Sequence, residues 1–306
     1  MNSIDKLITL AGVRGCLDLR CQLQGDWAMD HGQESVGVAP YHLVLSGDCL
    51  AELPDGSSLR LHAGDILVLP GGGSHLLRSQ GQRVASTAMR ISHAGLLPVH
   101  RFGAERADLD LLCGRFHYQR ESMLFAALPK YLLISGRELQ ANGQLAALVS
   151  LLRVEADGDQ AGARFLVDAL SSALFTLILR AYLQQQQPAS GTLALLADKR
   201  LSRAWQAMLE EPAHEWTIEA LAALANMSRA TFMRAFAAVA GASPWVLLTQ
   251  VRMELAYGLL SHSHLGLSDI AVQVGYQSQA AFSKKFKAIY GEAPGRLRRA
   301  AGWTAA

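Results

Sequence analysis

Polar and apolar residues alternate over short distances in the first half of the chain. Between residues 36 and 90, the runs YHLVLSG, CLAEL, SLRLHAG and DILVLP are separated by the stretches SGD, PDGSS and PGGG. A period of two is typical of strands that bury one face, and such Gly-, Pro- and Asp-rich stretches are typical of turns. Short strands at this spacing predict an all-β sandwich or barrel, to which 109–118 and 127–135 add further strands.

The hydrophobic period changes after about residue 143. QLAALVSLLRVEA and ARFLVDALSSALFTLILRAYL carry apolar residues every three or four positions, which predicts helices. The second helix has a continuous apolar seam, formed by Leu166, Leu170, Ala173, Leu177 and Ala181. Because residues 165–183 also include five polar or charged residues, we interpret them as a buried or dimerising helix and expect no membrane span.

The polar stretch QQQQPASG at 184–191 has the composition of a linker. We therefore expect an α+β multidomain protein with four parts. These are a β-barrel-like domain with helices at 1–140, a helical dimerisation segment at 141–187, a linker at 188–198 and an all-α domain at 199–306.

One helical motif occurs twice in the last third of the chain. RATFMRAFAAVAGASP at 229–244 aligns with QAAFSKKFKAIYGEAP at 279–294, an offset of 50 residues. Each copy is a short helix, a tight turn and a second helix, which is the plan of a helix-turn-helix whose second helix enters the DNA major groove. A structural solenoid usually needs at least about three repeats, whereas this chain has two. The repeat therefore predicts DNA binding.

Each copy also separates its apolar side chains from its basic ones. Two phenylalanines spaced four residues apart share one helix face and are expected in the core: Phe232 and Phe236, then Phe282 and Phe286. Gly241 and Gly291 are placed to end the two helices in the left-handed conformation. The basic residues are then left facing outwards.

Charge and motif content agree with this interpretation. Residues 199–306 carry 12 Lys and Arg against 7 Asp and Glu, whereas the other residues carry 16 against 19. A basic C-terminal part suits a polyanion-binding module. The chain has no GxSxG, GxxxxGK[ST] or HExxH motif, so we expect no enzyme, no catalytic residue and no cofactor.

The N-terminal residues and the cysteines indicate the cellular compartment of the protein. Residues 1–10 contain no long apolar run with a basic flank, and the cysteines at 16, 21, 49 and 113 form no CxxC pair. We therefore expect no secretory signal, reduced thiols and a cytoplasmic protein.

The C-terminal region resembles the AraC/XylS family of bacterial transcription regulators. The resemblance rests on MSRATFMRAF, GASPWVLLTQVRMELAYGLL and LSDIAVQVGYQSQAAFSKKFKAIYGEAPGRLR in that order, over about a third of the chain. It implies a homodimer that binds double-stranded promoter DNA and contacts RNA polymerase, most often as an activator.

The same resemblance implies which side chains meet DNA. The first recognition helix would present Arg229, Ala230, Met233 and Arg234, and the second would present Gln279, Ala280, Ser283 and Lys284. Arg234 is the main candidate for base reading, since arginine can pair with guanine O6 and N7. Lys285 and Lys287 would position the DNA backbone, and Arg252 of the linker helix would be structural or touch phosphate.

Residues 64–75, GDILVLPGGGSH, resemble the second motif of the cupin β-barrel, and 1–187 resembles the cupin-type sensor domain fused to AraC-type regulators. The first cupin motif, H-x-H followed by Glu, is missing apart from His42. We expect an effector pocket around His42, His75 and Cys113. Two histidines are too few for a cupin metal site, so no metal is expected, although Cys113 with His117, or His31, would extend the donor set.

LDLRCQLQGDW at 17–27 resembles the segment that holds a redox-active cysteine in regulators responding to reactive chlorine species. Cys21 would be the sensor, with Arg20 able to lower its thiol pKa and Cys16 as the resolving thiol. The stretch QRVASTAMRIS lacks the second cysteine of those regulators. The alternatives are a small organic effector or a metal in the barrel and, more distantly, a cupin-type enzyme.

Overall fold

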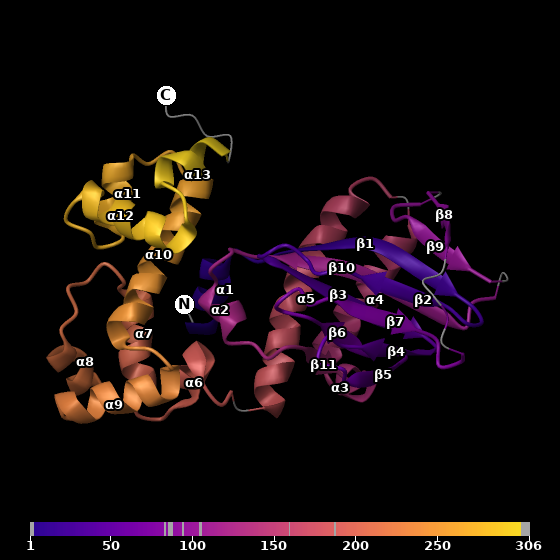
Figure 1. Ribbon diagram of the computed structural model, residues 1–306, viewed down its shortest axis with the longest axis horizontal. Coiled ribbons are helices and arrows are strands. Elements are labelled where there is room, and N and C mark those ends of the chain that lie inside the picture. Colours follow the sequence, from indigo (N-terminus) through magenta and orange to yellow (C-terminus); the bar gives the residue numbers. More distant parts are fainter. Residues whose placement is uncertain are drawn as a thin grey trace. The chain divides into compact units, whose positions relative to one another are not determined.

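The computed structural model describes residues 3–82, 84, 88–93, 95–103, 106–158, 160–186 and 188–300 (Figure 1). It consists of two compact units. A helical unit contains the described parts of Met1–Gly12, Gln119–Ala127 and Gln187–Ala306, and a β-rich unit contains those of Val13–Tyr118 and Leu128–Gln186. This division differs from the expected range 1–140, because two segments of that range, 1–12 and 119–127, group with the helical unit. Of the expected ranges, residues 1, 2, 83, 85–87, 94, 104, 105, 159, 187 and 301–306 lie outside the described residues.

The described strands of the β-rich unit form two sheets, as the alternating pattern predicts. The first has the order β11-β6-β3-β10-β1-β9-β8 and the second the order β2-β7-β4-β5. The strands are β1 (Arg14–Leu23), β2 (Ala28–His31), β3 (Val38–Ser46), β4 (Asp48–Glu52), β5 (Ser58–His62), β6 (Ile66–Val68), β7 (His75–Arg78), β8 (Arg90–Ser92), β9 (Val99–Phe102), β10 (Leu109–His117) and β11 (Leu132–Ile134).

The core of this unit draws side chains from both sheets. Leu67 and Leu111 come from the first sheet and Leu61 and Leu77 from the second, and all four are fully buried in one cluster. Gly114 lets β1, β3 and β10 approach closely: a Cβ there would lie 2.2 Å from the Cys16 carbonyl oxygen and 2.5 Å from the Tyr41 ring.

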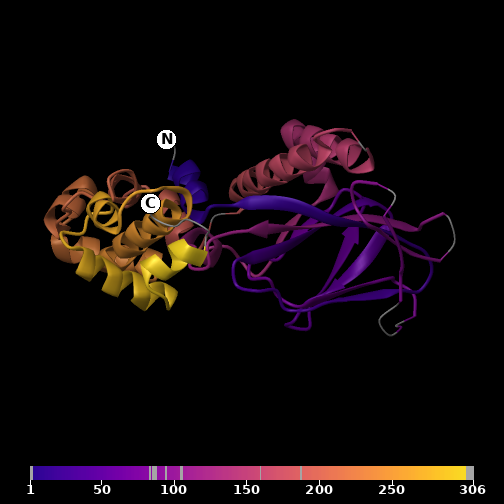
Figure 2. The ribbon, with the colours of Figure 1, turned by 90° about the horizontal axis from the view of Figure 1, so that it is seen from above.

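Helices α3 (Gly136–Ala141), α4 (Gly143–Asp157) and α5 (Ala163–Gln185) follow the last strand. Figure 2 shows α4 and α5, in pink, lying along one face of the sheets. By length and hydropathy alone α5 could cross a membrane. In the structure it packs along β1 and beside α4, and the Gly15 N–H donates to Ser172 Oγ at 2.9 Å. The apolar side chains of α5 therefore pack against a sheet of the β-rich unit.

The helical unit contains the two predicted helix-turn-helix pairs. Figure 1 shows α8 with α9 and α11 with α12, joined by the long α10. The helices of the unit are α1 (Ser3–Ala11), α2 (Met123–Ala126), α6 (Gly191–Ala197), α7 (Ser202–Glu210), α8 (Ile218–Leu224), α9 (Arg229–Ala240), α10 (Pro244–His262), α11 (Leu267–Gln273), α12 (Gln279–Tyr290) and α13 (Pro294–Ala300).

Caps at both ends define the two recognition helices, α9 and α12. Ser228 and Ser278 accept the Thr231 and Ala281 N–H groups as N-caps. Gly241 and Gly291 close the helices with φ of +70° and +77°. The core prediction for the four phenylalanines is confirmed, since none of them is exposed: Phe232, Phe236, Phe282 and Phe286.

A buried carboxyl group fastens α2 to α10. Glu254 Oε1 accepts the Met123 N–H at 2.7 Å, and Glu254 is fully buried. Burial raises the pKa of Glu254 to about 8, the nearby Glu121 charge acting in the same direction. The carboxyl group is therefore mostly protonated at neutral pH. Nothing in the sequence pattern predicts this contact.

Candidate nucleic-acid interface and sensor pocket

The basic residues of the repeat lie on the outer faces of α9 and α12. Arg229, Ala230 and Arg234 are exposed on α9, and Met233 is half-buried. At the equivalent places on α12, Gln279, Ala280 and Lys284 are exposed and Ser283 is half-buried; Lys285 and Lys287 are exposed further along. The exposed positions follow from the inward position of the phenylalanines, since residues that do not share their helix face turn towards solvent.

Two of these side chains are held by the preceding helix of their own pair. Arg229 Nη1 lies 3.2 Å from Glu219 Oε1, and Ser268 Oγ donates to Gln279 Oε1 at 2.7 Å. Both contacts are exposed and are therefore weak enough to exchange for DNA contacts. Arg234 and Lys284 make no ion pair with any residue that the structure describes.

The second site lies between the two sheets of the β-rich unit. The register places His42 of β3 opposite Cys113 of β10, and His31 of β2 opposite His75 of β7. His42 Nδ1 is 3.1 Å from Cys113 Sγ, and His42 Nε2 is 2.7 Å from His75 Nε2. The expected pocket residues are thus brought together, with His31 as a fourth member.

Hydrogen bonding sets the tautomers in this cluster. His75 Nδ1 lies 2.9 Å from the Gly73 carbonyl oxygen, which can only accept, so the proton is on Nδ1. A neutral His75 then accepts at Nε2, His42 donates from Nε2, and His42 Nδ1 accepts from the Cys113 thiol. Burial lowers the pKa of His42 and of His75, and lowers that of His31 to about 4. The three rings are therefore neutral at physiological pH.

Cys21 borders the same cluster. Its thiol is buried, shares a hydrogen bond with Cys113 and lies 3.7 Å from Met29 Sδ. A cavity of about 330 Å³ reaches it, lined by Leu19, Cys21, Met29, Asp30, His31, Met89, Ile91 and His100. The buried thiol therefore lies beside a cavity.

The chain matches known regulators along nearly its whole length. Residues 3–184 match the family model described as Cupin, and 221–300 match the one described as Helix-turn-helix domain. An uncharacterized HTH-type transcriptional regulator of Haemophilus influenzae is 39% identical over 98% of this chain and 99% of its own. The regulator MtrA of Neisseria gonorrhoeae is 34% identical over 99% of both. The chain is an AraC-type transcriptional regulator with an N-terminal cupin domain.

A third relative of this regulator is the RCS-specific HTH-type transcriptional activator RclR of Escherichia coli. It is 29% identical over 97% of both chains. The resemblance to AraC-type regulators, the α+β fold with a cupin-like domain and the role in transcription, all expected from sequence, are confirmed by these matches.

The structure separates the two residues expected to assist Cys21. Arg20 follows the opposite face of β1, because side chains alternate along a strand, and its guanidinium pairs with Asp110 and Asp157. Cys16 lies five residues from Cys21 on the same extended strand, which sets their Cα atoms about 16 Å apart. A disulfide needs Cα atoms within about 7 Å, so the regulator brings Cys113, not Cys16, next to Cys21.

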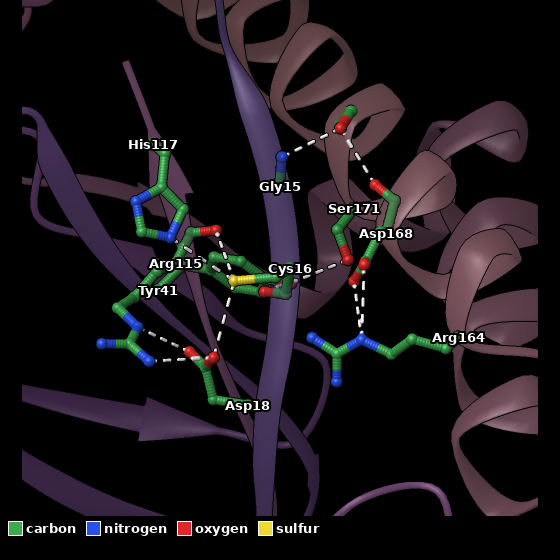
Figure 3. A network of polar contacts seen from close by, with 10 residues as sticks. Gly15, Cys16, Asp18, Tyr41, Arg115, His117, Arg164, Asp168 and Ser171 are labelled. Carbon is green, nitrogen blue, oxygen red and sulfur yellow. Dashed lines mark hydrogen bonds and ion pairs between the residues drawn. The ribbon is translucent and has the colours of Figure 1, made fainter. Parts of the chain in front are cut away.

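Cys16 belongs to a different network (Figure 3). Its Sγ lies 3.5 Å from Asp18 Oδ1 and 3.8 Å from His117 Nε2. Burial and the Asp18 charge raise the pKa of the Cys16 thiol to about 11. His117 therefore contacts Cys16 rather than the cluster of His31, His42 and Cys113.

Arg252 of the regulator has a structural place. Its Nε donates to the Pro212 carbonyl at 2.7 Å and its Nη2 donates to the His214 carbonyl at 3.0 Å. The guanidinium also lies 6.0 Å from the centre of the Tyr276 ring. Of the two roles expected for Arg252, these contacts favour the structural one, since they hold the segment before α8 against α10.

Proposed function

We propose that the regulator reads promoter DNA as a homodimer with α9 and α12, and that oxidants acting on Cys21 change this binding. The outward basic side chains of the two equivalent helices support the first part. Arg234 and Lys284 read base edges, and Lys285 and Lys287 hold phosphates. On the promoter the regulator acts next to RNA polymerase, as an activator.

The outer side of α5 supports a homodimer. Along the predicted seam, Leu166 and Ala173 are exposed, Leu170 and Leu177 are half-buried, and Ala181 at its end is buried, whereas the opposite side of the helix packs on β1. The neighbouring Phe165 is 82% exposed. A second copy of this helix would remove these apolar groups from water.

Replacing Leu166 with lysine is expected to weaken self-association at least about ten-fold, because a charge would enter an apolar contact. Sedimentation velocity over a range of concentrations measures this. Val36→Lys replaces another exposed apolar residue of the β-rich unit and should leave the dimer unchanged. A monomeric wild type, or an unchanged dimer in Leu166→Lys, would contradict the assignment of α5.

The position of Cys21 supports oxidant sensing. Its neighbours are oxidisable sulfur groups, the Cys113 thiol and the Met29 thioether, and a cavity gives access to it. Hypochlorous acid would remove two electrons from the Cys21 and Cys113 thiols. The products are one disulfide, chloride, water and a proton. This disulfide would join β1 to β10 and so shift two paired strands in the middle of the larger sheet.

Oxidation is expected to change promoter affinity by about ten-fold, a coupling free energy of ordinary size. Promoter binding and transcription are measured in vitro with reduced protein and with protein treated with hypochlorous acid. The DNA is the region upstream of the genes next to the regulator's own gene. Cys21→Ala should abolish the response. Cys16→Ala should retain it, since Cys16 lies in another network. A response that survives in Cys21→Ala would overturn the thiol switch.

A small organic effector is the second candidate function. The observation in its favour is the cavity of about 330 Å³, which falls within the range of ligand sites and is lined by both apolar and polar side chains. If neither wild type nor Cys21→Ala responds to oxidant, compounds that fit this cavity should be screened by their effect on promoter binding.

A further inference from the structure

We propose that the β-rich unit binds a free, extended peptide of roughly four residues, which adds a short strand to the outer edge of β11. The site is a cavity of about 580 Å³, lined by residues 129–135, Glu138, Tyr182, Gln185 and Gln186. It shares no lining residue with the cavity beside Cys21. The peptide site therefore does not rest on the proposed oxidant response or on DNA binding.

β11 lies at one edge of the larger sheet formed by the described strands. One side of β11 pairs with β6, so that Leu132 lies opposite Val68 and Ile134 lies opposite Ile66. The cavity follows the other side, because every residue from 129 to 135 lines it. An edge strand with an unpaired outer side is a template on which another strand can pair.

The pairing of β6 decides which backbone groups of β11 face the cavity. Leu69 and Leu67 direct their backbone groups to β3, since the Leu69 N–H donates to the Pro40 carbonyl at 3.0 Å and directions alternate along a strand. The residues on either side of Leu67 therefore direct theirs to β11. Leu133 lies opposite Leu67, so its own N–H and C=O point away from β6 and towards the cavity.

A peptide that runs antiparallel to β11 would use both groups of Leu133. Its N–H would donate to the Leu133 carbonyl, and its carbonyl would accept the Leu133 N–H. The backbone of Tyr131, two residues earlier, makes no hydrogen bond with a described residue and offers a second pair of groups. At about 3.3 Å per residue, the stretch from Lys130 to Ser135 has room for roughly four extended residues and their end groups.

The available edge ends at Ser135. Its N–H donates to Glu138 Oε2 at 2.7 Å, and its carbonyl accepts the Leu139 N–H at 2.9 Å as α3 begins. The backbone groups of Ser135 are thus already used within the chain. Since Tyr182 of α5 also lines the cavity, the edge is short and partly enclosed. Such an edge suits a small peptide better than the sheet edge of a second copy.

Charged side chains of opposite sign lie at the two ends of this edge. Lys130 precedes β11, and its largely exposed ammonium group lies 3.6 Å from Asp55 Oδ2. Glu138 follows β11, is half-buried and forms no ion pair with a described residue. In an antiparallel peptide the carboxylate would reach Lys130 and the ammonium group would reach Glu138. Complementary charges at both ends favour a free peptide over an internal protein segment, which carries neither charge.

The walls of the cavity indicate which peptide side chains fit. Tyr131 and Leu133 pack against the core of the β-rich unit on one side. On the other side Tyr182 is nearly buried, and its hydroxyl makes no hydrogen bond with a described residue. Successive side chains of an extended peptide would contact these two walls in turn. We therefore expect small or apolar side chains to be preferred.

Calorimetric titration of the full-length protein with tetraalanine and with trileucine tests the site. We expect saturable binding of one peptide per chain, because recognition through the main chain tolerates different side chains. Methylation of the peptide-bond nitrogens removes their hydrogens and should weaken binding by at least about ten-fold. Hydrogen exchange followed by mass spectrometry should show slower exchange within residues 129–138 when the peptide is bound.

Variants and blocked peptides test the end groups. Lys130→Glu should weaken binding of free peptides about five-fold, as expected for an exposed ion pair, and leave binding of peptides acetylated and amidated at their ends unchanged. Lys199→Glu is the matched control, since Lys199 is exposed and does not line the cavity. Circular dichroism shows that each variant is folded.

Two results would overturn strand addition at β11. One is the absence of binding of both free peptides to folded wild type, and the other is equal binding of the N-methylated peptides. Tighter binding of the blocked peptides than of the free ones would overturn the assignment to a free peptide and indicate a protein segment instead.

Discussion

Arg234→Ala is expected to lower affinity for the cognate promoter by about 5- to 150-fold. Arginine paired with a guanine contributes about 1–3 kcal/mol of discrimination, and 1.4 kcal/mol corresponds to ten-fold in affinity. Arg234 is exposed on α9 and has no ion-pair partner in the described chain, so its removal leaves no group unsatisfied in the free protein. Loss of affinity therefore reports DNA contact rather than folding.

Lys284 holds the equivalent place on α12, 50 residues further along the chain. Effects at well-separated sites add in free energy, so the double variant Arg234→Ala/Lys284→Ala should lose the product of the two factors. Lys287→Ala should instead weaken all sequences alike and reduce the salt slope by about one.

Fluorescence anisotropy with promoter and scrambled duplexes measures these effects over a salt series. Arg203→Ala removes an exposed arginine of α7, away from both recognition helices, and should change affinity less than two-fold. A double variant that still binds the promoter within two-fold of wild type would show that α9 and α12 are not the reading helices.

Glu254→Gln is expected to remove a pH-dependent loss of stability. The pKa of Glu254 is raised from 4.5 to about 8, so below pH 4.5 the group is protonated in both folded and unfolded chains and has no effect on stability. Between pH 4.5 and 8 the unfolded chain ionises while the folded chain holds its proton. The free energy of unfolding of wild type then falls by about 1.4 kcal/mol per pH unit, approaching roughly 5 kcal/mol in total.

Glutamine keeps the oxygen that accepts the Met123 N–H but has no charge to lose. Relative to wild type, the variant should therefore gain stability as pH rises from 5 to 8. Urea unfolding at several pH values measures the difference between the two proteins. Glu210→Gln, at an exposed carboxylate of α7, is the matched control. A difference that stays flat across this range would show that Glu254 titrates normally.

The helical unit could be largely read from the sequence, because its signals are local. The N-cap serines, the paired phenylalanines and the closing glycines all act within a dozen residues. The grouping of α1 and of 119–127 with this unit could not be read, since an amphipathic helix does not specify the surface that it covers. The contact between Glu254 and the Met123 N–H could not be predicted either, because it depends on α2 packing against α10.

The sensor pocket depends on long-range register. His31 meets His75 and His42 meets Cys113 only because particular strands pair, and composition does not fix that pairing. The role expected for Arg20 fails for a related reason. Arg20 and Cys21 are adjacent in β1, and side chains alternate along a strand, so the two lie on opposite faces. The structure instead pairs Arg20 with Asp110, 90 residues away.

The way the chain alternates between its two units limits which fragments of the regulator can fold on their own. The backbone passes from one unit to the other four times, after residues 12, 118, 127 and 186. A fragment that starts at residue 188 would keep both helix-turn-helix pairs but lose α1 and α2, which pack on α7, α6 and α10. It would also leave the carboxyl group of Glu254 without the Met123 N–H. The expected linker does not offer a free cut either, because α6 occupies residues 191–197 of it. The DNA-binding unit is therefore not one continuous segment of the chain. Exchanging it between regulators would require moving three segments together, 1–12, 119–127 and 187–306.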